Sequence, residues 1–131
     1  MIIYNFKYVF SFFFSRLFTV FSAVMLDTKG PEIRTGFFAN GETKIKLIKD
    51  DAIVLTTDYS FKGDSHKLAC SYSALPTSVA PGQNILVADG SVVLKVLSCD
   101  PSAGEVICRI LNSATIGERK NMNLPGVVVD L

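Results

Sequence analysis

Two short polar segments contain the residues of this chain that could do chemistry. The first, residues 27–36, reads DTKGPEIRTG and directly follows an apolar run. Its Arg34 offers a planar fork of N–H donors that suits a phosphate or a carboxylate, and Asp27 offers a hard oxygen for a cation. A polar turn held by local ion pairs is the alternative, and the residue types alone do not single out a substrate.

The second segment, residues 117–126, reads GERKNMNLPG and contains the chain's only adjacent pair of basic residues. Lys120 could serve there as a mobile point charge for a phosphate. A solvated basic turn is the alternative interpretation. Each of the two segments also contains a glycine next to a proline, Gly30-Pro31 and Pro125-Gly126, and we expect the chain to bend sharply at both.

Length and composition limit the classes of function. The 131 residues suffice for one ordinary domain, and the formal net charge of +1 provides no basic field that would attract nucleic acid. The three cysteines are widely spaced, which argues against a disulfide framework and against a zinc site. We expect ordinary buried thiols and no nucleic-acid partner.

The two segments flank a region of short strand-like runs separated by turn residues. Lys44–Ile48 alternates charged with apolar residues, as a half-buried strand does. Asp89-Gly90 between two apolar runs is a strong hairpin signal, because both turn positions favour φ > 0. The expected strands are residues 44–48, 52–57, 67–71, 84–88, 91–97 and 105–111. This pattern predicts an all-β fold, a small antiparallel β-barrel or sandwich.

The apolar character of the chain is concentrated at its beginning. Residues 1–24 hold seven of the ten phenylalanines, but Lys7 and Arg16 interrupt the run, so no uninterrupted piece reaches the roughly 20 residues of a spanning helix. The scattered charges also fit a signal peptide poorly. We therefore expect an apolar N-terminal segment without membrane association, and a helical conformation is one option for it.

Taken together, these motifs resemble pyruvate kinase. Residues 27–36 resemble the exit from that family's barrel domain into its lid, Ala88–Ser91 resembles the lid's internal hairpin, and residues 117–131 resemble the return to the barrel. The resemblance covers residues 23–131, and the sequence of this region is most similar to plant-type cytosolic forms. It implies that the expected barrel is the family's lid domain and that the protein is cytoplasmic.

The resemblance also implies roles for four positions. The family transfers the phosphoryl group of phosphoenolpyruvate to ADP in glycolysis, with Mg²⁺ and K⁺ as cofactors. Asp27 matches a K⁺ ligand through its carboxylate, and Thr28 matches one through its backbone carbonyl. Arg34 matches a residue that reaches the nucleotide or the transferred phosphate from the lid side, and Lys120 matches a second contact with the nucleotide phosphates. ADP or ATP and phosphoenolpyruvate are therefore the implied partners of the complete enzyme.

The resemblance further divides the chain and shows what it lacks. We expect an apolar segment unlike the family at residues 1–22, a barrel-strand remnant with the first hinge at 23–31, the lid at 32–124 and the second hinge at 125–131. The family's catalytic lysine and acidic Mg²⁺ ligands would lie beyond these residues, so no catalytic residue is assigned. Because a (β/α)₈ barrel takes about 250 residues, we expect the isolated chain to be inactive.

The sequence changes at Ala23 from an apolar segment to one that resembles the family, and two explanations for the apolar segment remain. We favour a truncated or misassembled gene product, a fragment that does not form the family's homo-oligomer. The alternative is a non-catalytic β-domain that binds a partner protein or a membrane through its apolar N-terminus.

Overall fold

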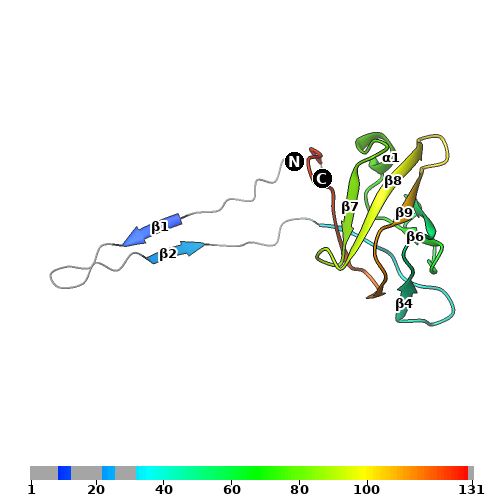
Figure 1. The fold of residues 1–131 in the computed structure, drawn as a ribbon, viewed down its shortest axis with the longest axis horizontal. Helices are drawn as coiled ribbons and strands as arrows, with labels where there is room; N and C mark the ends of the chain where they lie inside the picture. Colours follow the sequence, from blue (N-terminus) through cyan, green and yellow to red (C-terminus); the bar gives the residue numbers. More distant parts are fainter. Residues whose placement is uncertain (1–8, 13–21, 26–31, 130–131) are drawn as a thin grey trace. The chain divides into compact units, whose positions relative to one another are not determined.

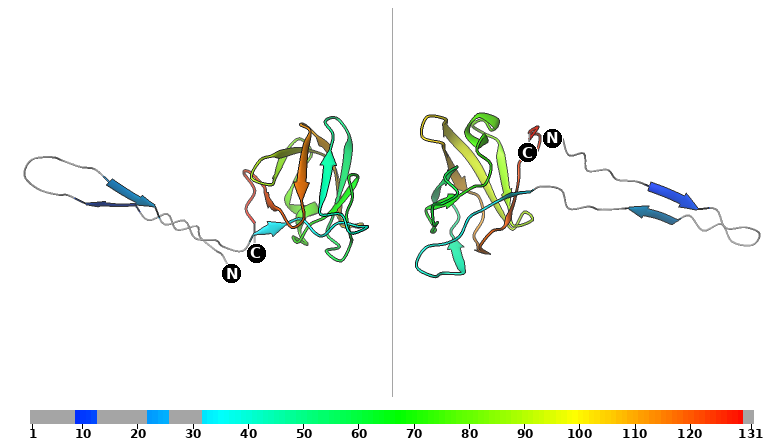
Figure 2. Two further views of the ribbon diagram at one scale, coloured as in Figure 1. Left: turned by 90° about the horizontal axis from the view of Figure 1, so that it is seen from below. Right: turned by 180° about the vertical axis from the view of Figure 1, so that it is seen from behind.

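The computed structural model describes residues 9–12, 22–25 and 32–129, and the chain divides into two compact units. Residues 32–129 form the larger unit, a strand-rich domain that Figures 1 and 2 show from three sides. Its strands are β3 (Ile33–Arg34), β4 (Lys44–Leu47), β5 (Ala52–Thr56), β6 (Lys67–Ala69), β7 (Asn84–Val87), β8 (Val92–Asp100), β9 (Glu105–Ile110), β10 (Ala114–Gly117) and β11 (Asn121–Asn123). One short helix, α1 (Leu75–Ser78), lies between β6 and β7.

The alternating runs of the sequence form these strands because each run has one apolar face to bury. In β4 the side chains of Ile45 and Leu47 are buried, while Lys44 and Lys46, which alternate with them, are exposed. The same alternation runs through β9, where Val106 and Cys108 point into a single hydrophobic core. All six expected strands are present, so the all-β prediction is confirmed.

Seven strands form one curled sheet in the order β3-β11-β7-β8-β9-β5-β6. Its two outer strands meet where Thr35, next to β3, forms a bridge with Cys70, next to β6. Two backbone bonds reinforce this closure, from the Gly36 N–H to the Ala69 carbonyl at 3.0 Å and from the Ser71 N–H to the Arg34 carbonyl at 2.9 Å. The small antiparallel barrel is therefore confirmed, with β5 and β6 as its one parallel pair.

The predicted hairpin joins β7 to β8. Asp89 and Gly90 have the expected positive φ angles of 57° and 84°, and Ala88 before them also has a positive φ, of 53°. A left-handed conformation at a residue with a Cβ costs roughly 1–2 kcal/mol. Two such residues in succession therefore need other contacts to hold this turn.

The helical option for the apolar N-terminal segment is wrong for its described residues. Val9–Phe12 (β1) and Ser22–Met25 (β2) form an antiparallel pair in which Val9 is opposite Met25. Neighbouring strands satisfy each other's backbone groups, as a helix would have done internally. Within the described residues, no helix has the length and apolarity that crossing a bilayer requires.

Candidate functional site

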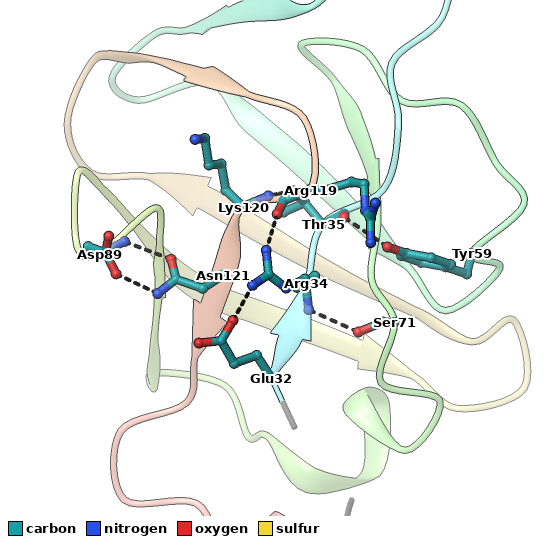
Figure 3. Close-up of polar contacts among 9 residues, drawn as sticks. All are labelled: Glu32, Arg34, Thr35, Tyr59, Ser71, Asp89, Arg119, Lys120 and Asn121. Carbon is teal, nitrogen blue, oxygen red and sulfur yellow. Dashed lines mark hydrogen bonds and ion pairs between the residues drawn. The ribbon is translucent and has the colours of Figure 1, made fainter. Parts of the chain in front are cut away.

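The barrel places Arg34 and Lys120 together although 85 residues separate them in the chain. Arg34 ends β3, and it lies opposite Asn121 in the antiparallel β3–β11 pair. Lys120 immediately precedes β11. Two cations from the two segments singled out in the sequence therefore lie at one edge of the barrel, as Figure 3 shows.

The Arg34 side chain is held by partners from both segments. Its Nη1 donates to the Arg119 carbonyl at 2.9 Å, and its Nη2 forms an ion pair with the Glu32 carboxylate. The Arg34 backbone N–H also donates to Ser71 Oγ at 2.9 Å. These contacts fix the direction of the guanidinium while leaving its side chain about 39% exposed. Arg34 is thus oriented and still accessible to an anion.

Thr35 fixes the backbone of Lys120. The Lys120 N–H donates to Thr35 Oγ1 at 2.9 Å, and the Thr35 N–H donates to the Lys120 carbonyl at 2.8 Å. Thr35 is fully buried, so its hydroxyl exchanges its water partner for a protein one. The carbonyl of Thr35 also accepts a hydrogen bond from the Tyr59 hydroxyl at 3.3 Å.

The Lys120 side chain extends away from this network (Figure 3). Its stem runs past Gly117, where an added Cβ would lie 3.1 Å from Lys120 Cε. Within the described residues the Lys120 ammonium takes part in no ion pair, since the two that occur are Arg34–Glu32 and Lys67–Glu105. Lys120 therefore presents a mobile positive charge from the backbone segment that neighbours Arg34.

Each acidic side chain around these cations is engaged by a partner. Glu32 pairs with Arg34, and the Glu118 carboxylate accepts the Phe38 N–H at 2.8 Å. Asp89, in the β7–β8 turn, is bound by the side-chain amide of Asn121. Arg34, Arg119 and Lys120 therefore lie among three carboxylates, each of which already has a hydrogen-bond or ion-pair partner.

An aromatic surface adjoins the cations. Phe37 is 49% exposed, and the Arg119 guanidinium lies 5.5 Å from the centre of its ring. Tyr59 is 40% exposed, whereas Tyr72 is buried. The Tyr59 ring lies outside the core because its hydroxyl reaches back to Thr35.

The other predicted site residues, Asp27 and Thr28, lie outside the described residues. The structure adds Thr35 and Asn121 as residues that sequence reasoning missed. Their hydrogen bonds join positions far apart in the chain, and neither residue type signals such a partner. One available signal was the alternation of polar and apolar residues at 121–124, which marks β11 as a strand.

The described part of the chain contains no group of three or more metal-ligating side chains that could hold a cation. Its cysteines are not reactive centres either. Burial raises the pKa of the Cys70 thiol to about 11, and burial followed by the nearby Cys99 raises the pKa of Cys108 to about 12. Among the groups described at this surface, the Arg34 guanidinium and the Lys120 ammonium are the ones that could bind an anion.

Comparison with known proteins identifies the family. A family model described as "Pyruvate kinase, barrel domain" matches residues 14–131. The match begins nine residues before Ala23, where the motifs placed the start of the resemblance. The chain is 57% identical over 112 residues to the cytosolic isozyme of pyruvate kinase from Glycine max, a match that covers 86% of this chain and 22% of that protein.

A further relative and a solved structure to which the chain is similar are also pyruvate kinases. The probable cytosolic isozyme from Arabidopsis thaliana is 57% identical over 109 residues, covering 83% of this chain and 22% of that protein. A pyruvate kinase from Cryptosporidium parvum superposes with a TM-score of 0.75 at 51% identity, over 79% of this chain and 20% of that one. The chain thus spans about a fifth of the length of the proteins it matches. This chain belongs to the pyruvate kinase family.

Proposed function

We propose that this chain supplies the nucleotide-facing lid of a pyruvate kinase, the enzyme that moves the phosphoryl group of phosphoenolpyruvate onto ADP. In that reaction the bond from phosphorus to the enol oxygen breaks, and a bond from phosphorus to a terminal oxygen of ADP forms. Catalysis of such a transfer depends on positioning and on neutralising oxygen charge. Arg34 and Lys120 are the residues of this chain suited to that task.

The observation that carries the proposal is the meeting of Arg34 and Lys120 on neighbouring backbone segments. Arg34 is a fixed fork that can donate hydrogen bonds to two phosphate oxygens, and Lys120 is a flexible point charge that can follow a moving phosphoryl group. A solved relative, the Cryptosporidium parvum pyruvate kinase described in complex with ADP, supports ADP as the ligand. It is 52% identical, with a TM-score of 0.69 over 76% of this chain and 19% of that one.

The metal ions of the reaction are assigned by donor chemistry alone. The Asp27 carboxylate and the Thr28 backbone carbonyl are hard oxygen donors of the kind that a K⁺ ion takes. The described residues offer no acidic cluster for Mg²⁺, so we assign that ion to parts of the enzyme outside this chain. Such ions would neutralise phosphate charge when bound, while this chain's own cations bind and orient the nucleotide.

Titrating the ¹⁵N-labelled 131-residue chain with ADP tests this function directly. We expect the backbone amides of Arg34, Thr35 and Lys120 to shift together with a dissociation constant in the millimolar range, because only one side of the site is present. Lys120→Ala and Arg34→Ala should each weaken ADP binding by about threefold to tenfold, as expected for loss of one charged hydrogen bond at an exposed surface.

The matched control is Lys95→Ala, which removes an exposed lysine from β8 and leaves Arg34 and Lys120 unchanged. This variant should bind ADP as the unaltered chain does. Equal weakening by Lys95→Ala would show that ADP responds to net charge alone. No shift at the three amides at any ADP concentration would refute the assigned site.

We also propose that the protein acts in the cytoplasm, since two of its most similar relatives are named as cytosolic isozymes. The alternative is a non-catalytic domain that docks through its apolar N-terminus. Residues 32–129 form their own core and close their own sheet, so the candidate site needs nothing from that segment to be assembled.

A further inference from the structure

Asn121 holds the β7–β8 turn by three hydrogen bonds, two through its side-chain amide and one through its backbone carbonyl. Its Oδ1 accepts the Asp89 backbone N–H at 2.9 Å, and its Nδ2 donates to the Asp89 carboxylate. Its own backbone carbonyl accepts the Ala88 N–H at 2.9 Å. Figure 3 shows this side chain between the turn on one side and Arg34 on the other.

These hydrogen bonds extend the contacts of the very short strand β11 to the β7–β8 turn. β11 pairs with β7 at only two positions, Met122 with Val87 and Asn123 with Leu86. Asn121 lies just beyond that ladder. There its side-chain hydrogen bonds to Asp89 add to the backbone bond that it accepts from the Ala88 N–H. The bonds from Asn121 also hold Ala88 and Asp89, the two residues whose positive φ angles strain the turn.

The hydrogen bonds of Asn121 also fix the position of the negatively charged Asp89 carboxylate. Asn121 directly follows Lys120 in the chain and is opposite Arg34 in the sheet, so Asp89 is anchored to a residue that adjoins both cations. Within the described residues the Asp89 carboxylate forms no ion pair with either of them. A carboxylate released at this place would compete with phosphate oxygens for the same two cations.

We propose that Asn121 is a positioning residue of the phosphate site, because its amide holds the Asp89 carboxylate on the turn and so keeps Arg34 and Lys120 available to a nucleotide. This inference rests on the proposed function and extends it. A neutral amide suits the role, since it satisfies a carboxylate through a hydrogen bond without adding a charge of its own.

A purely structural role for Asn121 makes a different prediction. If Asn121 only stiffened the turn, removing the Asp89 charge would not compensate for losing the amide. If it restrains a charge, the loss of Asn121 should matter only while Asp89 is ionised. Asp89→Asn keeps the size of the side chain and removes the charge, so it separates the two roles.

The experiment is an ADP titration of the 131-residue chain, followed at the Arg34 and Lys120 amides, in four versions: unaltered, Asn121→Ala, Asp89→Asn and the double variant. Asn121→Ala should raise the dissociation constant of ADP about threefold to tenfold, and this gap should narrow at high salt because screening weakens the competing charge. Asp89→Asn alone should bind at least as tightly as the unaltered chain. The double variant should return to within about twofold of it.

Two results would overturn the inference while leaving the proposed function in place. One is an unchanged dissociation constant in Asn121→Ala, and the other is a double variant as weak as Asn121→Ala. If the unaltered chain itself fails to bind ADP, the proposed function fails first and this inference with it. Should Asn121→Ala not fold, the neutral Asn121→Ser takes its place, with the same rescue by Asp89→Asn expected.

Discussion

Thr35 shows how much one buried polar side chain contributes to this surface. It is fully buried, and it has hydrogen-bond contacts with Lys120 through both backbone and side chain and with Tyr59 through its carbonyl. A buried hydroxyl whose partner is removed costs about 1–3 kcal/mol, so the arrangement is kept only while every partner is present. The residue between Arg34 and Gly36 thereby sets the position of a cation from the far end of the chain.

The three cysteines differ in burial, which predicts a graded reactivity. Cys70 and Cys108 are buried and their pKa values are raised to about 11 and about 12, so almost no thiolate forms at pH 8. Cys99 is only half-buried, although burial raises its pKa as well. Because the thiolate is the reactive form, iodoacetamide should modify Cys99 first, faster as the pH rises.

Intact-mass measurement with peptide mapping checks this order. The folded chain should take up one label quickly and the other two only after unfolding in denaturant. A Cys99→Ser variant should show no fast uptake. Rapid labelling of Cys70 in the folded chain would mean that the barrel opens where Thr35 meets Cys70.

At the scale of elements, the closure of the sheet depends on the close approach of two backbones. A Cβ built on Gly36 would lie 2.8 Å from the Ala69 Cβ, and the Gly36 N–H is bonded to the Ala69 carbonyl. Neither strand can retreat without losing that bond. Gly36→Ala should therefore lower the free energy of unfolding by about 1–3 kcal/mol, the usual cost of overpacking a core.

Urea denaturation followed by circular dichroism measures this change. Ser73→Ala is the control, because Ser73 is exposed and its loss should change the unfolding free energy by no more than about 0.5 kcal/mol. An unchanged midpoint for Gly36→Ala would contradict the tight closure between residues 36 and 69.

The sequence predicted those elements whose signals are local. Charge alternation in β4 and the Asp89-Gly90 turn depend on neighbouring residues, so both could be recognised directly. The two-residue β3 escaped recognition because so few residues show no period, and β11 was missed although residues 121–124 alternate polar with apolar side chains. For the apolar N-terminal segment a helix was one option, because a short apolar run does not distinguish a helix from a strand.

The residues of the candidate site also divide into those that the sequence reveals and those that only the fold brings together. Arg34 and Lys120 were found from residue type and from the family resemblance, which carry information about chemistry. Asn121 and Thr35 were not found, because their roles depend on which distant backbone lies beside them. Only the closed sheet brings Asp89 within reach of Asn121.

At the scale of the whole molecule, the length of the chain limits what it can catalyse. The chain spans about 22% of the relative from Glycine max, and a (β/α)₈ barrel alone takes about 250 residues. We therefore expect no pyruvate from the isolated chain when phosphoenolpyruvate, ADP, Mg²⁺ and K⁺ are supplied.

A lactate dehydrogenase-coupled assay checks this expectation by the oxidation of NADH. A complete pyruvate kinase added to the same mixture at the end is the positive control and should start the signal at once. NADH oxidation that scales with the concentration of the 131-residue chain would show that the chain is active on its own.

The closure of the sheet through β3 and β11 has a consequence for the order of folding. Arg34 and Asn121 pair across almost the whole length of the domain, and closing so long a loop is entropically costly before other contacts form. The hairpin of β7 and β8 and the pairing of β8 with β9 involve much shorter loops. A partly folded chain can therefore contain most of its native sheet while Arg34 and Lys120 are still far apart, so phosphate binding would report completed folding of this domain.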